Sequence, residues 1–438
     1  MVCRCGDDGH SFALGAKPNL MRVFLHTFGC KANQYDTELI RQSVEEHGGH
    51  IVRSIDEADA VVVNSCTVTQ SGEAKLRNLI RRTERRAGAP RAVVVGCAAT
   101  VDDGTIAAMQ GVSAVVGGVD PSDVLEALGL EPKSDLSPTL KKFSSSARAW
   151  LKIQDGCDEH CTFCATVLAR GSNRSRSPAE ILTEAKALAE HHEELVLTGV
   201  HIGSYGADLE EDTSLSKLLE WLIASLPGVR FRLSSVEATE VDERLEELMS
   251  AVPDRLAPHL HAPLQSGSDR ILKRMGRHWY DAKRYRERIE RLAGKLQVFG
   301  LGADVMVGFP GETDDDFTQT LNLVNELPFT YLHVFPYSER PNTAAPRLGN
   351  NVPSHKIKMR SEELRALGES KQRAYQESRV GMRADVVVLG RHGGVRQGVT
   401  EDYLDVEIAD TRDNHRRIGG TIVKQVRGKL LAEPVGAR

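Results

Sequence analysis

Short runs of consecutive apolar residues recur in the first part of the chain, and each is followed by a segment with helical character. The runs cover residues 23–25, 60–63, 92–95 and 114–116. Uninterrupted β-branched runs of this length are typical of strands that are buried on both faces of a parallel sheet. We therefore expect residues 21–130 to form an α/β domain with a doubly wound parallel sheet.

A second strand and helix series fills residues 147–378. The expected strands cover residues 149–153, 195–198, 230–234, 259–263, 301–307 and 332–335. The expected helices cover residues 178–191, 215–226, 314–327 and 355–376. Six such units predict an open, partial (βα)6 barrel, in which ligands bind at the carboxyl ends of the strands.

The remaining segments differ in character from these two series. Residues 385–389, 403–408 and 421–426 alternate apolar and polar positions between glycine-containing turns, which predicts a small β-barrel over residues 379–438. Residues 131–146 are polar and contain two prolines and three consecutive serines, so we interpret them as a linker. Residues 1–20 are interpreted as an N-terminal extension, and its Cys3 and Cys5 are assigned no role.

Composition narrows the class of protein. The chain has 438 residues, of which 40% are hydrophobic and 27% charged, which is an ordinary balance for a chain of two or three soluble domains. It contains no apolar run of the roughly 18–20 residues that a membrane span needs, and no secretory signal is recognised. Eight cysteines fit metal ligation better than disulfides in a reducing compartment. We therefore expect a cytoplasmic protein without a membrane partner.

Three cysteines on one short segment carry the strongest chemical signal. Cys157, Cys161 and Cys164 form a C-x₃-C-x₂-C run in residues 155–164. Three thiolates hold three irons of a [4Fe–4S] cluster and leave the fourth iron open, as a catalytic metal keeps an open position. The amino and carboxylate groups of S-adenosylmethionine (SAM) suit that open iron. The alternative is a zinc site completed by His160, although zinc sites usually pair C-x₂-C with a second, distant pair.

Three further cysteines follow the apolar runs of the first domain. Cys30, Cys66 and Cys97 each come shortly after a predicted strand. The carboxyl ends of parallel strands meet at one edge of a sheet, so these cysteines are expected to converge in space. This pattern favours a second iron–sulfur cluster. The alternative is that they are buried small apolar residues without a ligand.

The chain resembles the radical-SAM superfamily in residues 157–164 and, within it, the methylthiotransferase family in residues 29–35, 66–69 and 151–157. The closest branch is the bacterial MtaB type, which modifies N6-threonylcarbamoyladenosine at tRNA position 37. The resemblance implies a radical-SAM barrel, a TRAM-like C-terminal domain and two [4Fe–4S] clusters. It further implies that Cys157, Cys161 and Cys164 hold the cluster that generates a radical from SAM, and that Cys30, Cys66 and Cys97 hold a cluster that carries the donated sulfur.

The same resemblance implies a reaction and its partners. One SAM methylates the sulfur, a second supplies the radical, and C2 of the adenine receives the methylthio group within the anticodon loop. SAM contacts are expected from Phe163, Gly199, Glu237 and Gln265. An electron donor such as flavodoxin or ferredoxin is also expected.

Other functions remain open from the sequence. Residues 261–268 look as much like the branch that modifies isopentenyladenosine at position 37, and residues 165–168 depart from the usual family pattern. The same chemistry on a ribosomal protein is a further alternative. A non-enzymatic iron–sulfur scaffold or electron carrier is the alternative from a different class, and the open three-cysteine motif argues against it.

Candidate RNA contacts come from local charge, because the net charge of −5 does not indicate nucleic-acid binding. Phosphate binding needs a basic patch and not a basic protein. One cluster on an expected helix comprises Arg77, Arg81, Arg82, Arg85 and Arg86. A second cluster after the three-cysteine motif comprises Arg170, Arg174 and Arg176. The alternative for the first cluster is a helix face that is merely solvated.

Overall fold

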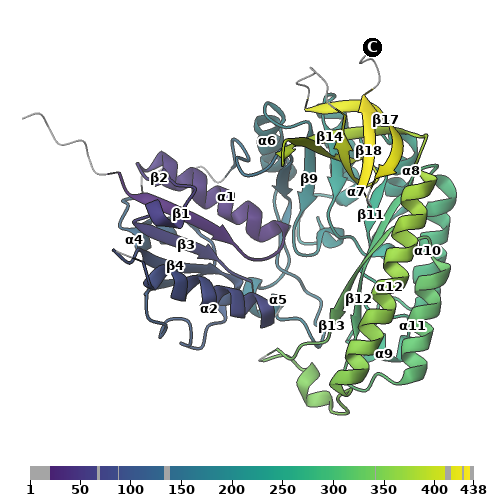
Figure 1. The fold of residues 1–438 in the computed structure, drawn as a ribbon, viewed down its shortest axis with the longest axis horizontal. Coiled ribbons are helices and arrows are strands. Elements are labelled where there is room, and N and C mark those ends of the chain that lie inside the picture. The colour runs from purple at the N-terminus through teal and green to yellow at the C-terminus, as the bar shows by residue number, and fades with distance from the viewer. Residues whose placement is uncertain are drawn as a thin grey trace, which may run out of the picture.

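The computed structural model describes residues 20–66, 70–86, 88–132, 139–340, 342–409, 416–426 and 429–434. Cys3 and Cys5 lie outside the described residues. Figure 1 shows an N-terminal α/β domain beside a larger central barrel, with a small β-barrel against one end of the latter. The predicted fold class is confirmed. Among the described residues, no helix is both long enough and apolar enough to cross a membrane.

The N-terminal domain is a five-stranded parallel sheet between two helical layers, with strand order β2-β1-β3-β4-β5. The strands are β1 (Arg22–Thr27), β2 (His50–Ile51), β3 (Ala60–Asn64), β4 (Arg91–Gly96) and β5 (Val112–Gly117). The helices are α1 (Lys31–Glu46), α2 (Gln70–Glu84), α3 (Cys97–Thr100) and α4 (Pro121–Leu128), with a 3-10 turn, η1, at Ile55–Glu57. Val62 packs on the side of α1 and α4, whereas Val61 and Val63 pack on the side of α2. The apolar runs are therefore uninterrupted because both faces of the sheet are covered.

The central domain is an open barrel of six parallel strands. They form two sheets, β6-β9-β10 and β11-β12-β13, which are joined by a parallel bridge between Ser235 and His261. The strands are β6 (Ala149–Lys152), β9 (Glu194–Thr198), β10 (Arg230–Leu233), β11 (His259–His261), β12 (Gly300–Val307) and β13 (Tyr331–Pro336). β7 (Gln154–Asp155) and β8 (Arg174–Ser175) form a separate, short antiparallel pair outside these two sheets.

Helices cover the outside of this barrel and begin at recognisable caps. The outer helices are α6 (Pro178–Ala189), α7 (Leu215–Ser225), α8 (Glu243–Ala251), α10 (Ala282–Lys295), α11 (Asp314–Glu326) and α12 (Ser354–Ser378). Helix α6 starts with a capping box between Ser177 and Glu180 and a proline in its first turn, and α11 starts with the Thr313–Asp316 box. Shorter elements are α5 (Thr166–Arg170), α9 (Asp269–Arg274), η2 (Ile202–Ser204), η3 (Ala238–Glu240) and η4 (Ala345–Leu348).

The C-terminal domain is a closed barrel with strand order β14-β15-β16-β18-β17. Its strands are β14 (Arg383–His392), β15 (Val395–Thr400), β16 (Asp405–Ile408), β17 (Arg417–Val426) and β18 (Lys429–Pro434). β15 and β18 are not among the predicted strands. In β15 the apolar pattern is interrupted by Gly398, where a Cβ would overlap the side chain of Val386. The glycine is needed for close packing in the small core, and it removes the alternation that would have marked the strand.

This small barrel is seated on the amino ends of the central strands. Arg232 of β10 donates hydrogen bonds to the backbone oxygens of Thr400 and Glu401, both at 2.9 Å. Gly300, the first residue of β12, lies so close to Asp402 that a Cβ would overlap the backbone there. The end of the barrel opposite to the cysteines is therefore covered.

Candidate functional site

The segment with the three-cysteine motif crosses the carboxyl ends of the central strands between β7 and α5. The backbone N–H of Cys157 donates to the oxygen of Gly171 at 3.0 Å. In the middle of the segment, Thr162 donates to Met275 and accepts from Ala345, both at 2.8 Å. These bonds fix the path of the loop at its start and at its middle.

The sulfur atoms of this loop have the surroundings of metal-bound thiolates. Backbone N–H groups donate to the Sγ atoms of Cys157 and Cys164 at 3.4 Å, and hydrogen bonds to sulfur tune iron–sulfur sites. Burial, opposed by the guanidinium of Arg277 and assisted by the neighbouring Cys164 and Cys157, raises the pKa of Cys161 to about 12. Binding of iron would replace that proton. The donor set fits a [4Fe–4S] cluster with three protein ligands.

The second cysteine set lies at one edge of the N-terminal sheet, as the strand pattern predicts. Cys30 precedes α1, Cys66 follows β3 and Cys97 opens α3 after β4. Gly29 has a φ of +133°, and a Cβ at this position would lie 2.9 Å from the Cβ of Cys66. On the other side, the N–H of Ala98 donates to Ser65 at 3.1 Å. Three free thiols therefore meet at one edge, and they too fit a cluster with three ligands.

Two buried asparagines join the loops that carry Cys30 and Cys66. The side-chain amide of Asn33 donates to Oδ1 of Asn64 at 2.8 Å, and Asn64 donates to the backbone oxygen of Asn33 at 2.9 Å. The Sγ of Cys30 lies 3.1 Å from Oδ1 of Asn33. Sequence reasoning did not assign these residues a role. The signal was a polar residue, Asn64, at the end of an otherwise apolar strand.

Arg170 connects the two cysteine sets. Its Nε donates to the Sγ of Cys97 at 3.2 Å, its Nη1 to both oxygens of Asp155 at 3.0 Å, and its Nη2 to Asp36 at 2.8 Å. Asp155 is two residues before Cys157. The prediction that Arg170 contacts RNA phosphates is therefore wrong, because its guanidinium is buried and bound to groups of the protein interior.

The other two arginines of that cluster differ from each other. Arg176 donates to the backbone oxygen of Lys152 at 2.7 Å and to Glu184 at 2.9 Å, so most of its guanidinium faces the protein. Its side chain remains 20% exposed, and its contact with an RNA phosphate stays a prediction. Arg174 is exposed, and its contact with RNA stays a prediction.

Two of the predicted SAM contacts lie beside the three-cysteine loop. Phe163 packs against an apolar cluster that includes Phe309, and the two rings meet edge to face with centroids 6.3 Å apart. Gln265 lies beyond the end of β11, has a φ of +60° and is bridged to Val305 of β12. Both residues are at the carboxyl end of the barrel, and their contacts with SAM stay predictions.

Position 199 requires a glycine because Gln154 leaves no room there for a side chain. A Cβ on Gly199 would lie 2.7 Å from both the backbone oxygen and the Oε1 of Gln154. Oε1 of Gln154 accepts from the N–H groups of Val200 and His201 at 3.0 and 2.9 Å, and its Nε2 donates to Gly156 at 2.6 Å. Gln154 therefore anchors the turn before Cys157 to the end of β9. The sequence analysis did not predict this role of Gln154. Its signal was that Gln154 lies within the segment 151–157, on which the family resemblance rests.

Glu237 is bound by two neighbours in the structure. Its carboxylate pairs with Arg277 and accepts from Nε1 of Trp279 at 2.8 Å. Arg277 in turn points Nη1 at the Sγ of Cys161 from 3.6 Å. A contact between Glu237 and SAM stays a prediction, and the structure adds that Glu237 holds the cation beside the loop sulfur.

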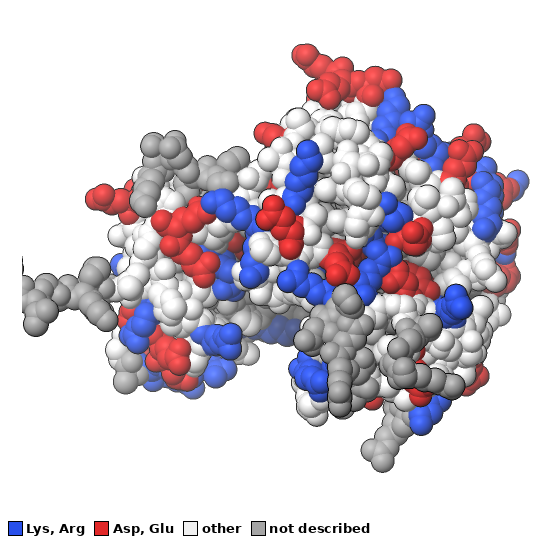
Figure 2. Space-filling model, turned by 90° about the horizontal axis from the view of Figure 1, so that it is seen from above, with Lys and Arg blue, Asp and Glu red and all other residues white. Residues whose placement is uncertain are grey.

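The arginines of α2 and of the two residues after it form a basic surface. Arg81, Arg82, Arg85 and Arg86 line a surface pocket of about 430 Å³, and Arg86 also pairs with Asp56. Arg77 is exposed on the same helix. Figure 2 views the molecule from the side of the C-terminal barrel and shows basic and acidic side chains interspersed there, so positive charge does not cover that side as a whole. A role of α2 in RNA binding stays a prediction.

Comparisons with known proteins agree with this geometry. Residues 151–324 match the Radical SAM superfamily and residues 22–118 match the Uncharacterized protein family UPF0004. The threonylcarbamoyladenosine tRNA methylthiotransferase MtaB of Bacillus subtilis is 36% identical over 414 residues, covering 89% of this chain and 91% of the relative. The protein of the same name from Aquifex aeolicus is 34% identical over 418 residues, covering 91% and 98%.

A solved structure supports the fold alone. The radical SAM methyltransferase TsrM of Kitasatospora setae, solved with cobalamin and a [4Fe-4S] cluster, superposes with a TM-score of 0.55 at 13% identity over 74% of each chain. Together with the cysteine geometry and the relatives' coverage, these findings show that the chain belongs to the MtaB-type methylthiotransferase family of radical-SAM enzymes.

Proposed function

We propose that the protein methylthiolates C2 of N6-threonylcarbamoyladenosine at position 37 of tRNA, using SAM and two [4Fe–4S] clusters. The observation that carries this proposal is the arrangement of two three-cysteine sets around Arg170, which bonds to Cys97 of one set and to Asp155 beside the other. The chain is also similar, over about nine tenths of its length, to relatives named for this activity.

The reaction explains why both cysteine sets are needed. C2 of an adenine carries no acidic proton and no leaving group, so acid–base groups alone cannot replace its hydrogen. When bound, the cluster at Cys157, Cys161 and Cys164 supplies the electron that cleaves SAM, and the cluster at Cys30, Cys66 and Cys97 supplies the sulfur.

The chain's own residues position these groups and shield them. Arg170, Asp155 and Asp36 fix the N-terminal domain against the central barrel, and Gln154 and Arg277 hold the three-cysteine loop. The C-terminal barrel covers the opposite end of the central barrel, which limits the access of water to a reactive radical.

The remaining partners follow from the proposed reaction. The arginines of α2 and Arg174 would contact tRNA phosphates. A second basic pocket, of about 370 Å³, has Lys142, Arg391, Arg396 and Arg416 in its wall and lies between the central and C-terminal barrels. A flavodoxin or ferredoxin would deliver electrons, and the location would be cytoplasmic, where tRNA is modified.

Mass spectrometry of tRNA nucleosides from cells with and without the protein tests this proposal. Deletion should remove the 2-methylthio form of N6-threonylcarbamoyladenosine and leave the unmethylthiolated nucleoside in its place. The wild-type gene should restore the product, and a Cys157→Ala variant should not. Loss of a methylthio group from isopentenyladenosine or from a ribosomal protein instead would replace the proposed substrate by one of those.

A further inference from the structure

Strand β13 presents a row of aromatic rings to the interior of the central barrel. Leu332 and Val334 pack on the side of α12, so Tyr331, His333 and Phe335, which alternate with them, face inward. The ring centroids of Tyr331 and His333 are 5.4 Å apart, and those of His333 and Phe335 are 6.3 Å apart. β13 is the last strand of its sheet, so this row lies at the open edge of the barrel.

The upper part of this row is accessible. Phe335 is 41% exposed, and the side chain of His333 is 54% exposed. Phe335 is opposite Met306 of β12, and Met306 packs against the same apolar cluster as Phe163 of the three-cysteine loop. Exposed rings near the three-cysteine loop offer a surface on which a base can stack.

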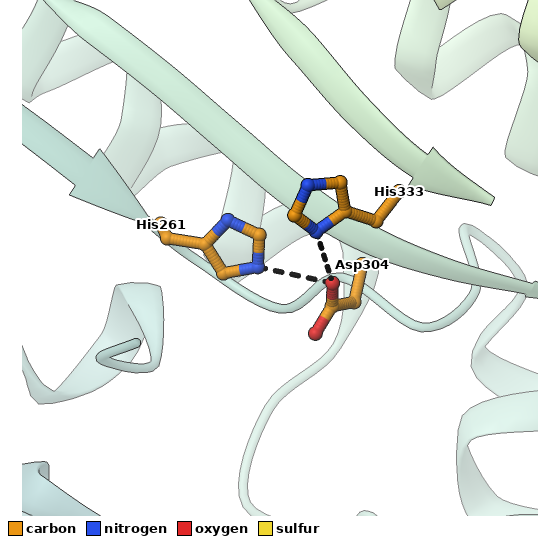
Figure 3. Close-up of side chains that lie close together, drawn as sticks. All are labelled: His261, Asp304 and His333. Carbon is orange, nitrogen blue, oxygen red and sulfur yellow. Dashed lines mark hydrogen bonds and ion pairs between the residues drawn. The ribbon is translucent and has the colours of Figure 1, made fainter. Parts of the chain in front are cut away.

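A polar group lies beside the row. Oδ1 of Asp304 is 3.0 Å from Nε2 of His261 and 3.3 Å from Nδ1 of His333, as Figure 3 shows. The hydroxyl of Tyr331 lies 3.1 Å from Nδ1 of His261. Burial would raise the pKa of Asp304, but hydrogen bonds and charge from the two imidazoles hold it well below its usual value. The group therefore brings a carboxylate, two imidazoles and a phenol hydroxyl together in one place.

The deep end of the row is closed by a ring of the C-terminal barrel. Tyr403 of the C-terminal barrel stacks there, with its ring 5.6 Å from Tyr331 and 4.5 Å from His259. Burial lowers the pKa of His259 well below its usual value, and the positive charges of Arg232 and Lys31 act in the same direction.

We propose that Phe335 and His333 receive the base at tRNA position 37 by stacking, and that His261 and Asp304 hold the polar substituent on its N6 atom. This inference rests on the proposed function and names the receptor for its substrate. Single-stranded RNA bases that are splayed from a loop are commonly stacked on aromatic side chains and hydrogen-bonded at their edges.

The same three polar residues are also ligand types for a divalent transition metal. A metal would account for His261, Asp304 and His333, which lie within 4.8 Å of one another through their ligand atoms. It would not account for the exposed ring of Phe335 next to them. A nucleobase with a polar substituent accounts for both features, and the metal becomes an outcome of the test.

Stacking can be measured with an anticodon stem–loop that carries 2-aminopurine at position 37. The reconstituted holoenzyme with SAM and without reductant should quench its fluorescence. Phe335→Ala and His333→Ala should lose most of this quenching and bind the stem–loop about tenfold more weakly. Trp221→Ala is the matched control, because Trp221 on the outer face of α7 is also 41% exposed. Full quenching in the double variant Phe335→Ala/His333→Ala would overturn the proposal.

Recognition of the substituent is tested with stem–loops that carry N6-threonylcarbamoyladenosine or adenosine at position 37. The wild type should prefer the modified loop, and His261→Gln and Asp304→Asn should reduce that preference about tenfold while cluster absorbance stays unchanged. An unaltered preference in both variants overturns this inference alone. A wild type that binds neither loop contradicts the proposed function. A preference that EDTA abolishes and Zn²⁺ restores overturns the receptor in favour of a metal site.

Discussion

The guanidinium of Arg170 faces two carboxylates and one thiol sulfur inside the protein. Desolvation opposes its charge, but Asp36 and Asp155 outweigh this effect and raise its pKa above the usual value. A permanent cation therefore lies 3.2 Å from a sulfur that would ligate the second cluster. A positive charge and a hydrogen bond at a ligand sulfur favour the reduced, more negative form of an iron–sulfur cluster.

Replacing Arg170 by Gln should make the second cluster harder to reduce. Losing one charge-assisted hydrogen bond should lower the midpoint potential by on the order of 60 mV. The potential can be measured by EPR-monitored titration in a background with Cys157, Cys161 and Cys164 changed to Ala, so that only the second cluster contributes. Arg174→Gln is the control, because Arg174 is exposed on the same stretch of chain. Equal potentials in both variants would contradict the role of Arg170.

Asp155 should contribute to stability in a pH-dependent way. Burial favours its neutral form, but Lys152 and Arg170 outweigh burial and lower its pKa to about 2. A carboxyl with a lowered pKa in the folded state stabilises the fold above its unfolded pKa of roughly 4. That contribution, on the order of 2 kcal/mol, is lost as the pH falls toward 2.

The free energies of unfolding of cluster-free wild type and Asp155→Asn check this pH dependence. The wild type should be more stable at pH 6–7, and the difference should shrink below pH 4. Asp212→Asn, which changes a carboxylate whose side chain is 96% exposed, should show no comparable change. A difference between wild type and Asp155→Asn that is constant from pH 7 to pH 3 would mean that the charge of Asp155 is not the cause.

At the scale of elements, the sequence predicts those strands and helices that have a clear pattern of apolar residues of their own. The buried strands β3 and β4 were recognised because their runs of β-branched residues are uninterrupted. β2 was missed because it has two residues, and β15 because Gly398 breaks its pattern. The convergence of Cys30, Cys66 and Cys97 followed from the parallel topology alone.

The contacts between elements could not be predicted in the same way. Arg170 is 73 residues from Cys97 in the chain, and nothing in its local sequence separates a buried cation from one that waits for a phosphate. The aromatic row of β13 could not be predicted for the same reason. Its alternation predicts a strand, but the occupant of its inner face depends on β11 and β12 beside it.

Helix α2 and the residue after it carry a prediction of their own, because Arg81, Arg82 and Arg85 are exposed along one surface. Replacing Arg81, Arg82 and Arg85 by Gln should weaken tRNA binding and reduce the salt dependence of the dissociation constant. The slope of log K against log salt should fall by about one unit for each phosphate contact that is removed. Iron content and SAM cleavage without substrate should persist.

A charge-matched control distinguishes a contact surface from general electrostatics. Lys283 on α10 and Lys358 and Arg373 on α12 are exposed, with side-chain exposures of 83%, 79% and 59%. Changing all three to Gln alters the net charge equally and should leave the slope unchanged. Equal slopes for both triple variants and the wild type would show that α2 is only a solvated face.

At the scale of the whole molecule, three domains leave one end of the barrel for chemistry. The C-terminal barrel is bonded to the amino ends of the central strands through Arg232 and Tyr403. The N-terminal domain is bonded near their carboxyl ends through Arg170 and Lys152. A macromolecular substrate is thereby directed to the end where both cysteine sets lie, and each set belongs to a different domain.

This division predicts that the two cysteine sets can be separated functionally. Reconstituted wild type should hold about eight irons, and changing Cys30, Cys66 and Cys97 to Ala should leave about half. That variant should still cleave SAM to 5′-deoxyadenosine, because the other loop is held by Gln154 and Arg277 within the central barrel, but it should form no methylthiolated tRNA. The matched variant with Cys157, Cys161 and Cys164 changed to Ala should lose both activities while also keeping about half the iron. If the first variant loses SAM cleavage while circular dichroism shows an intact fold, the two sets form one shared site, and the bond from Arg170 to Cys97 is its simplest physical link.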